Sequence, residues 1–320
     1  MSESEYDVAF DLSDSDAHVH KRWDRDRDPV LEVSSRDVVR VDCRDADDGQ
    51  LHEGMTVEDL REHSIVGHAL TGPIAVEGCE PGDVLQVDVL DVEHGDWGYT
   101  HFRPAEEGVG LLPEEFDDPW AYIWDLGEDN GHFVDGIEVP LDPFPGVLGV
   151  APDAAGPHST SPPRRVGGNM DVKHLTEGAT LFLPVEVENA LFSVGDGHAA
   201  QGDGEVCIAG IEAPINVTVR LTARRDLSID RPQFRTDGPF EPAGLDGGAA
   251  IATSGVGGDL YEAARSAVRQ LIDRLERERG LDRREAYVLC SVAADLKINE
   301  LVNPNTVVSA YLAERLFPEE

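Results

Sequence analysis

The stretch TLFLPVEVENALFSVGDGHAAQGDGE, residues 180–205, decides the fold, because two apolar strand patterns run into a glycine-rich polar turn. Residues 180–187 alternate apolar and polar side chains, as half-buried strands do, and residues 190–194 form an apolar run. Four titratable residues lie between the glycines that follow: Asp196, His198, Asp203 and Glu205. Titratable side chains on a glycine-rich turn anchored to a buried strand are typical of a functional site.

Alternating, β-branched segments recur along the first two thirds of the chain, at residues 30–33, 38–42, 74–77, 84–90 and 215–221. The Pro-Gly-Asp turn within residues 78–83 is expected to join two of them as a strand pair. Residues 97–165 are dense in Gly, Pro and aromatic side chains, which indicates long ordered loops. Residues 18–223 are therefore predicted as a mainly β body of sandwich or barrel type.

The C-terminal part has a different pattern. Asp259 precedes an apolar i, i+3, i+4 stripe that Gly280 closes, which predicts a helix. Asp282 and Glu285 have the spacing of a capping box and predict a second helix. We expect an α+β fold with one domain at residues 18–320, helical from about 255 to 320. Residues 1–17, acidic and weakly periodic, are predicted as a poorly ordered leader.

The charge balance excludes one class of partner. The 320 residues include 26 Lys and Arg against 64 Asp and Glu, a formal charge of −38, which disfavours nucleic acid. Only three of the cations are lysines, and 40% of the residues are hydrophobic. An acidic surface over an ordinary core suits concentrated salt, where the screening length falls to about 3 Å at 1 M. We therefore expect a salt-rich cytoplasm; an acidic protein from an ordinary cell is the alternative.

The four cysteines are far apart and include no C-x-x-C pair, so they predict buried thiols rather than a disulfide scaffold: Cys43, Cys79, Cys207 and Cys290. The first residues carry no basic start or apolar h-region, and no run of about 18 apolar residues occurs. These features predict a soluble, cytoplasmic protein without membrane association.

The glycine-rich turn has the residue types of a metal centre. In an extended segment Asp196 and His198 point to one face, and carboxylate plus imidazole suits Zn²⁺ or a similar divalent cation. Asp203 and Glu205 share a face on the return strand, where one could orient a water molecule and act as a base. An acidic hairpin turn that happens to contain a histidine remains the alternative interpretation.

A second polar cluster is Gly167–Asp171, where paired glycines allow close backbone approach and Asn169 could bind a carboxamide; an Asx-turn is the alternative. The chain has no G-x-S-x-G elbow, no phosphate-binding loop and no H-E-x-x-H helix. Metal-activated water therefore fits the remaining residues better than a covalent nucleophile does.

Several of these motifs also carry a resemblance. TGPIAVEGCEPGD (71–83), PFPGVLGVAP (143–152), GGNMD (167–171), residues 181–205 and EAYVLCSVAADLKINELVN (285–303) resemble the acetamidase/formamidase family in order and spacing. The resemblance extends from about His18 to Phe317. It implies hydrolysis of a short aliphatic amide to ammonia and a carboxylate, a mainly β body with a helical C-terminal part, and a homo-oligomer.

The resemblance also implies roles for particular residues. A divalent metal, expected to be zinc, would be held by Asp196, His198 and an N-terminal histidine, His18 ahead of His20. The catalytic pair is expected to be Glu205 and Asp203, and the substrate is expected to contact Asn169, Asp171 and Gln201. Cys79 and residues 164–166 depart from the family pattern, which leaves the pocket rim open. Two alternatives are hydrolysis of another C–N bond, cyclic or N-substituted, and non-catalytic binding of a small amide.

Overall fold

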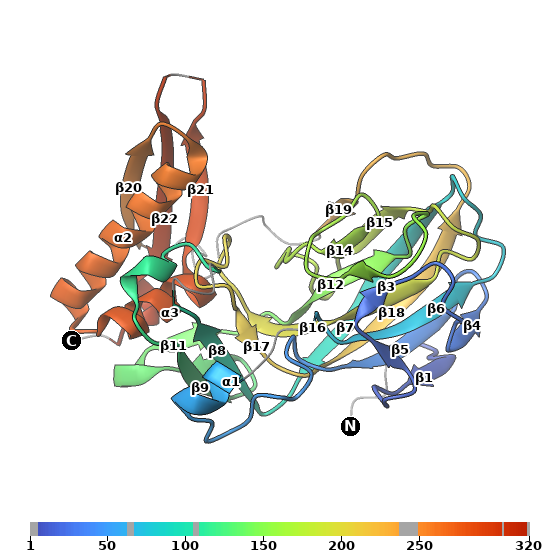
Figure 1. Cartoon of the computed structure of the whole chain (residues 1–320), viewed down its shortest axis with the longest axis horizontal. Coiled ribbons are helices and arrows are strands. Elements are labelled where there is room, and N and C mark those ends of the chain that lie inside the picture. The colour runs from blue at the N-terminus through green and yellow to red at the C-terminus, as the bar shows by residue number, and fades with distance from the viewer. Residues whose placement is uncertain (1–5, 63–66, 105–108, 237–248, 303, 319–320) are drawn as a thin grey trace.

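Two β-sheets pack face to face in the half of the molecule that contains the N-terminus (Figure 1). The computed structural model describes residues 6–62, 67–104, 109–236, 249–302 and 304–318. The six-stranded sheet has the order β1 (Phe10–Leu12), β5 (Val38–Cys43), β18 (Ile215–Arg224), β7 (Val84–His94), β15 (Thr180–Pro184) and β19 (Gln233–Arg235). Its pairs are antiparallel except β1 with β5.

The second sheet has eleven strands and extends beyond the sandwich. Its main path is β11 (Glu138–Pro140), β10 (Asn130–His132), β9 (Trp120–Leu126), β8 (Trp97–Phe102), β17 (Ile211–Glu212), β16 (Phe192–Ala200), β12 (Phe144–Val150) and β14 (Gly167–Asn169). Strand β6 (Leu70–Val76) pairs with β16, and β2 (Val19–His20) and β4 (Leu31–Val33) pair with β6. A small separate sheet joins β3 (Arg22–Trp23) to β13 (His158–Ser159).

The remaining elements form a C-terminal unit that stands beside the sandwich (Figure 1). Strands β20 (Ala250–Gly257), β22 (Thr306–Ala313) and β21 (Asp295–Glu300) form an antiparallel sheet, and α2 (Leu260–Arg279) and α3 (Arg283–Ala293) pack beside it. Helix α1 (Val57–Glu62) and three 3-10 turns, Pro113–Glu115, Val134–Gly136 and Glu314–Leu316, complete the described elements.

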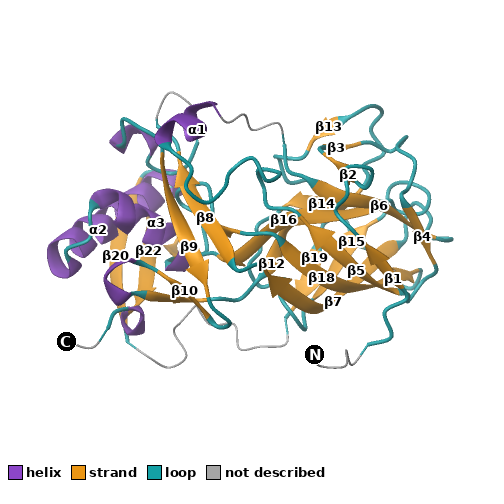
Figure 2. Ribbon diagram, turned by 90° about the horizontal axis from the view of Figure 1, so that it is seen from below, coloured by secondary structure: helices purple, strands orange, loops and turns teal. Residues whose placement is uncertain are grey.

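Strand β16 joins the two halves (Figure 2). Its first residues, Phe192 and Val194, belong to the core between the two sheets. Its last residues, Ala199 and Ala200, belong to a second core, which the helices and β20–β22 share with β8 and β9. The strand is buried along its whole length, so its polar middle residues lie at the junction between the two cores.

The α+β, mainly β class is confirmed, as are both helix caps. Asp259 accepts a hydrogen bond from the Glu262 amide at the start of α2, and Gly280 ends the helix at φ 74°. Asp282 and Glu285 form the predicted capping box of α3. The four cysteines are buried free thiols, as expected.

The predicted helical segment from 255 to 320 is wrong in part, because three strands accompany the two helices. Because β20 consists mostly of small residues, its sequence pattern does not predict a strand. A Cβ on Gly255 would lie 2.0 Å from the Ala263 carbonyl oxygen, so the strand needs a glycine where α2 packs against it. Residues 97–165 also contain six paired strands, β8 to β13, with loops between them. Most of their aromatic residues occupy strand positions, and the glycines and prolines lie mainly between strands.

The expected strand pair at 74–77 and 84–90 is also corrected. Both segments are strands, but β6 pairs in the eleven-stranded sheet and β7 in the six-stranded sheet. The turn at 78–83 therefore passes from one sheet to the other, a choice of partner that periodicity does not encode.

Residues 6–17 are more ordered than the predicted leader. Phe10–Leu12 form β1, which pairs with β5, and Leu12 is buried in the sandwich core. Residues 1–5 lie outside the described part of the chain. No helix among the described residues combines the length and apolar character that crossing a bilayer requires.

Candidate active site

A cavity of about 280 Å³ lies beside the middle of β16, at the junction of the two halves. We call it the inner cavity. It is lined by Ala46, Asp47, His68, His101, Val109, Ser161, Asn169, Asp171, Asp196, Glu205, Ile208, Ala209 and Glu212. Segments far apart in the sequence therefore supply its wall, since β8, β14, β16 and β17 all end or pass beside it.

His198 lies among the carboxyl groups of the polar wall, although it is not itself a lining residue. Its ring is 1% exposed and stacks on Phe144, with centroids 4.9 Å apart and planes 11° apart. Its Nδ1 donates to the Asp196 carbonyl oxygen at 3.0 Å, so in the neutral ring Nε2 carries a lone pair. That Nε2 faces two acceptors, Glu212 Oε1 at 3.1 Å and Glu205 Oε1 at 3.7 Å. A lone pair opposite carboxylate oxygens is favourable only if a proton or a metal ion lies between them.

Four carboxyl groups converge on this imidazole, and burial penalises their ionisation. Burial raises the pKa of Glu212 to about 8 and raises that of Glu205, which His198 partly offsets. Burial and the charges of Glu205 and Asp196 hold the pKa of Asp171 well above its usual value. Burial lowers the His198 pKa, but the Glu212 and Asp196 charges outweigh it and raise that pKa well above 6.5. The cluster contains too little positive charge for all four carboxyl groups to ionise.

The absence of a side chain at Gly146 allows this cluster to form. A Cβ there would lie 2.6 Å from Asp171 Oδ1 and 2.7 Å from both Asp196 Oδ2 and His198 Cε1. The predicted convergence of Asp196 and His198 is therefore seen at one point on β12. Asp196 reaches it from a left-handed conformation, φ 63°, and not from the extended backbone that we expected.

Left-handed conformations are frequent in the cavity wall. Asp171, Asp196, Glu205 and Ile208 have φ values of 48°, 63°, 42° and 89°. Such conformations cost about 1–3 kcal/mol each in non-glycine residues and persist where the surroundings fix them. The wall is thus built against local backbone preference.

The turn that carries Glu205 is anchored on the C-terminal unit. Gly202 N donates to the Ser291 carbonyl at 2.8 Å, and a Cβ on Gly202 would lie 2.1 Å from Ala294 O. Glu205 N closes the turn onto the Gly202 carbonyl at 3.1 Å. The position of the Glu205 carboxyl group therefore depends on the end of α3.

A buried ion pair strengthens this anchor. Lys173 and Asp295 are 6% and 1% exposed and form a salt bridge, and Asp295 Oδ1 also accepts the Asp203 amide at 2.9 Å. The Asp203 carbonyl accepts Leu296 N at 3.0 Å. Because Lys173 follows Asp171 by two residues, the pair ties both sides of the inner cavity to the start of β21.

Two overlapping sets of side chains have the geometry to hold a metal ion. Asp171, Asp196 and His198 form one set, and His198, Glu205 and Glu212 form the other, with the donor atoms of each set within 4.8 Å of one another. Within the described part of the chain, Asp171 Oδ1, His198 Nε2 and Glu212 Oε2 are buried without a hydrogen-bond partner. Imidazole and carboxylate donors left in this state fit a divalent cation.

The predicted substrate residues lie at or beside the inner cavity. Asn169 lines it, and its buried Oδ1 has no hydrogen-bond partner in the described ranges of the chain. Asp171 also lines it, next to the imidazole. Gln201 is 3% exposed and supports the wall from behind, since its Nε2 donates to the Asp171 carbonyl at 3.0 Å.

Three predicted positions do not reach the cavity wall. The Asp203 side chain is 42% exposed and lies 3.9 Å from Lys173 Nζ, because the turn directs it to β21. His18 binds the Ser13 carbonyl through Nδ1 at 2.9 Å. His20 is buried, but its Nε2 contacts Ser193 Oγ at 2.9 Å, and burial lowers its pKa to about 4. Neither histidine lines the inner cavity.

Sequence reasoning missed four titratable lining residues. Glu212 is 2% exposed and interrupts the apolar run around Ile211. A single acidic residue in an apolar run could have indicated a functional residue. His101 and Asp47 form a buried pair with 3.2 Å between Nε2 and Oδ2, and the Tyr99 hydroxyl donates to Asp47 at 3.0 Å. His68 lines the cavity, and its buried Nδ1 has no hydrogen-bond partner among the residues that the structure describes. These last three residues have no distinctive spacing.

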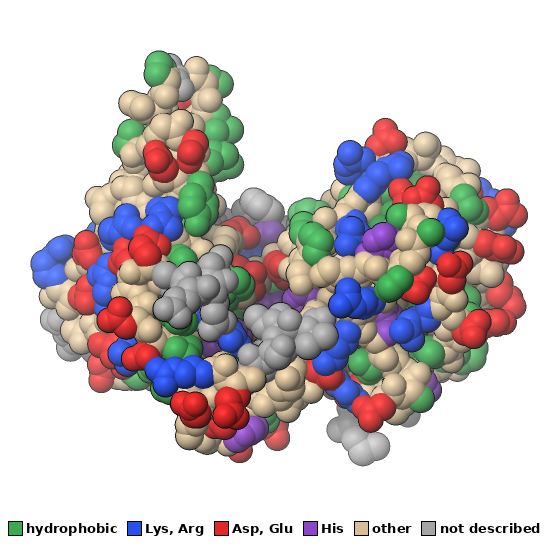
Figure 3. All heavy atoms as spheres, viewed as in Figure 1, with side chains coloured by type: hydrophobic (Ala, Val, Ile, Leu, Met, Phe, Trp, Pro, Cys, Tyr) green, Lys and Arg blue, Asp and Glu red, His purple; other side chains and the backbone are tan. Residues whose placement is uncertain are grey.

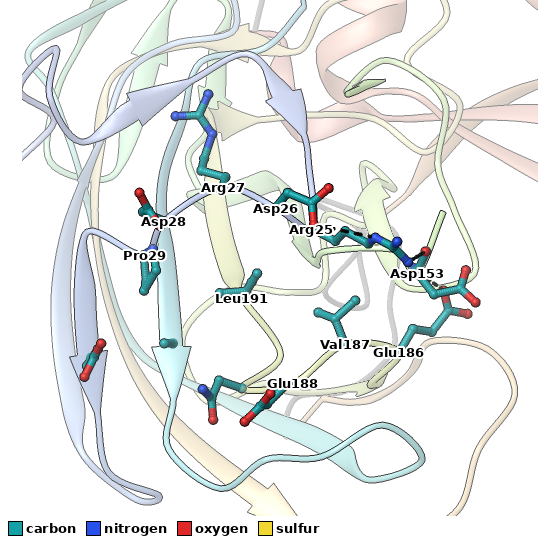
Figure 4. Close-up of a pocket in the computed structure, with 13 residues that line it drawn as sticks. Arg25, Asp26, Arg27, Asp28, Pro29, Asp153, Glu186, Val187, Glu188 and Leu191 are labelled. Carbon is teal, nitrogen blue, oxygen red and sulfur yellow. Dashed lines mark hydrogen bonds and ion pairs between the residues drawn. The ribbon is translucent and has the colours of Figure 1, made fainter. Parts of the chain in front are cut away.

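A second cavity, the outer groove, lies on the sandwich (Figure 4). Its volume is about 480 Å³, and its lining includes Arg25, Asp153, Glu186, Glu188 and Leu191. Arg25 donates to the Asp153 carbonyl, and Glu186 receives the Asp153 amide at 3.1 Å. No polar side-chain atom of its lining is buried without a partner among the described residues.

Comparison with known proteins gives the enzyme class. A formamidase from Methylophilus methylotrophus is 27% identical over 95% of this chain and 90% of its own length. A Bacillus halodurans acetamidase structure is 30% identical, with a TM-score of 0.67 over 95% of this chain and 97% of its own. A gamma lactamase structure from Delftia acidovorans is 26% identical, with a TM-score of 0.90 over 98% and 94%. The protein is an amidohydrolase.

The sequence profile of the Acetamidase/Formamidase family matches residues 5–159 and 153–319, nearly the whole chain. The chain belongs to this family, and the predicted resemblance is confirmed.

Proposed function

We propose that the protein is a metal-dependent hydrolase that converts short aliphatic amides of the formamide and acetamide type to ammonia and a carboxylate. The observation that carries the proposal is the His198 Nε2 lone pair, buried and turned toward the oxygens of Glu205 and Glu212. A cation bound between the Nε2 lone pair and these oxygens would remove their mutual repulsion. The family membership supports the substrate class.

The residues that would hold the metal are Asp171, Asp196 and His198, which leaves Glu205 free as a base; the alternative set of His198, Glu205 and Glu212 would make Glu205 a ligand. His18, the expected third ligand, is replaced in the proposal because it lies outside the cavity wall. A zinc ion fits the imidazole and carboxylate donors. When bound, such an ion supplies Lewis acidity that polarises the amide carbonyl and acidifies water.

The protein's own groups then move the proton. Glu205 is suited to take a proton from water as the new C–O bond forms, since burial raises its pKa toward neutrality. It returns the proton to the amide nitrogen as the C–N bond breaks, so that ammonia leaves. Asn169, which lines the cavity and has a buried Oδ1 available as an acceptor, accepts a hydrogen bond from the amide NH₂ group. Asp203, the second expected catalytic residue, has no role here.

The test is ammonia release from formamide, acetamide and propionamide before and after dialysis against a chelator. We expect turnover in the metal-loaded protein, loss of turnover after chelation, and recovery on addition of Zn²⁺. Full activity in protein shown by elemental analysis to be metal-free would contradict metal dependence, and absence of ammonia from the loaded protein would contradict the substrate class.

A second candidate function is hydrolysis of a cyclic amide. The gamma lactamase structure matches the fold at a TM-score of 0.90, against 0.67 for the Bacillus halodurans acetamidase. Opening of a lactam yields an amino acid and no ammonia. Assay of a five-membered lactam by chromatography, beside the ammonia assay, therefore separates the two activities.

Further proposals concern the state of the protein. Apolar side chains are exposed on the arm formed by β20–β22, with Val256 61%, Ile298 58% and Val302 90% exposed, which supports a homo-oligomer. Light scattering coupled to size exclusion tests this. Acidic side chains are spread over both halves (Figure 3), which supports a salt-rich cytoplasm as the environment.

A further inference from the structure

Ile208 has a backbone conformation that β-branched residues avoid. Its φ is 89°, in the left-handed region, and Ile208 lines the inner cavity. A β-branched residue in this region is a genuine outlier, because its two Cβ substituents crowd the backbone. The position would be less strained with glycine, so the presence of isoleucine calls for a physical reason.

The neighbouring backbone is fixed on both sides of Ile208 by one buried hydroxyl. Ser291 Oγ accepts the Cys207 amide at 3.0 Å and donates to the Ala209 carbonyl at 2.7 Å. Ile208 N donates to the Glu205 carbonyl at 2.9 Å. The chain between residues 207 and 209 is therefore held against α3, which fixes the backbone position of Ile208.

The cavity is lined by residues of two kinds. Asn169 and the carboxyl groups are polar, whereas Ala46, Val109, Ile208 and Ala209 are apolar. The oxygen and nitrogen of a primary amide need polar partners, and its acyl group is the only part that apolar side chains bind favourably. Isoleucine is the largest of the four apolar lining residues.

We propose that Ile208 is the specificity-determining residue of the acyl subsite, where its clamped side chain limits the length of the acyl chain. The strain at Ile208 is then the consequence of placing a bulky group into a small cavity. This inference rests on the proposed function, since it requires linear amides as substrates.

The test measures kcat/KM for acetamide, propionamide and butyramide in wild type and in Ile208→Ala. We expect the butyramide-to-acetamide ratio to rise at least tenfold, because one methylene in an apolar subsite changes selectivity about 10–200-fold. Val206→Ala is the matched control: Val206 is 3% exposed and packs in the helical core, so its truncation leaves the ratio unchanged. Ile208→Val, which keeps the fold more conservatively, is expected to move the ratio in the same direction by less.

A stability measurement gives a second readout. Glycine usually destabilises relative to alanine, but at a positive φ this order reverses. Ile208→Gly is therefore expected to melt at or above the temperature of Ile208→Ala. If folded Ile208→Ala and Ile208→Val both keep the wild-type ratio while wild type releases ammonia from acetamide, the inference fails and the proposed function stands. If wild type hydrolyses none of the amides, both fail.

Discussion

The inner cavity and the outer groove have similar residue types but opposite environments. Both contain several acids, and both contain left-handed residues: Asp196 and Ile208 in one, Asn189 and Leu191 in the other. In the groove the charges stay near solvent and bind neighbours, as Glu186 does with Arg165 at 2.9 Å. At the cavity, several buried donors and acceptors have no partner among the described residues. Their concentration there distinguishes the inner cavity from the outer groove, whereas charge or strain alone does not.

The largest difference between the two regions is expected from the same substitution, Glu→Gln, made once in each of them. Glu205→Gln removes the proposed proton acceptor and should lower kcat about 10²–10⁴-fold with the fold intact. Glu188→Gln, at an exposed position of the outer groove, should change kcat less than twofold. Steady-state ammonia release measures both. Near-normal turnover in Glu205→Gln would remove the acid/base role.

A glycine substitution tests how tightly the cavity is packed. Gly146→Ala pushes a methyl group against Asp171, Asp196 and His198, and should destabilise by about 1–3 kcal/mol. Displacement of catalytic groups by about 1 Å costs about 10²-fold in rate. The control is Gly258→Ala, where the nearest side-chain atom lies 3.7 Å from the added Cβ. Equal kcat and melting temperature for the two variants would show that the cluster has room to shift.

In the metal-free protein no cation compensates the buried carboxyl groups around His198, so the stability of the fold should depend on pH. The pKa of Glu212 is raised to about 8 in the folded protein by burial, so between about 4.5 and about 8 the unfolded chain binds fewer protons. Stability must therefore fall as pH rises through this window. His198 acts in the same direction, because its raised pKa gives stability that is lost as pH rises through that pKa.

Thermal melts of chelated protein between pH 5 and 8 measure this fall. Glu212→Gln, which cannot ionise, should flatten the slope, whereas Glu188→Gln in the outer groove should keep it. A wild-type slope in Glu212→Gln would mean that the cluster does not control the pH dependence.

The smallest effect is expected at the exposed charges. With a formal charge of −38, added KCl should screen repulsion between surface carboxylates and raise stability by about 1–2 kcal/mol, a few degrees in Tm. The Glu205→Gln rate defect should be independent of KCl, because buried groups are screened little. A melting temperature that does not respond to KCl would contradict the salt-adapted interpretation.

Local sequence patterns predicted much of the fold. The Asp259 cap, Gly280 and the Asp282–Glu285 box predicted both long helices correctly, because capping depends on neighbours in the chain. Strand partners were not predictable. The sequence at 78–83 predicts a hairpin turn, but the two strands that it joins pair in different sheets. Contacts between residues far apart in the chain decide which strands pair.

The same limit applies to the site. Asp196, His198 and Glu205 lie on one short segment, so the motif placed them near the cavity correctly. Glu212 and His101 approach from β17 and β8, and only the assembled sheet brings them in. Asp203 illustrates the reverse error: its spacing from Glu205 suggests a shared face, but the Asp295 contact turns it to the other side of the turn.

The position of β16 across two cores has a consequence for how the enzyme loses activity. Glu205 is anchored through Ser291 and Asp295 of the C-terminal unit, whereas Asp196 and His198 follow the sandwich end of the strand. Partial detachment of the helical core would separate these groups while leaving the sandwich folded. As the urea concentration rises, activity should be lost before most of the β-sheet circular dichroism. Loss of activity would then indicate that the two halves separate before the sandwich unfolds.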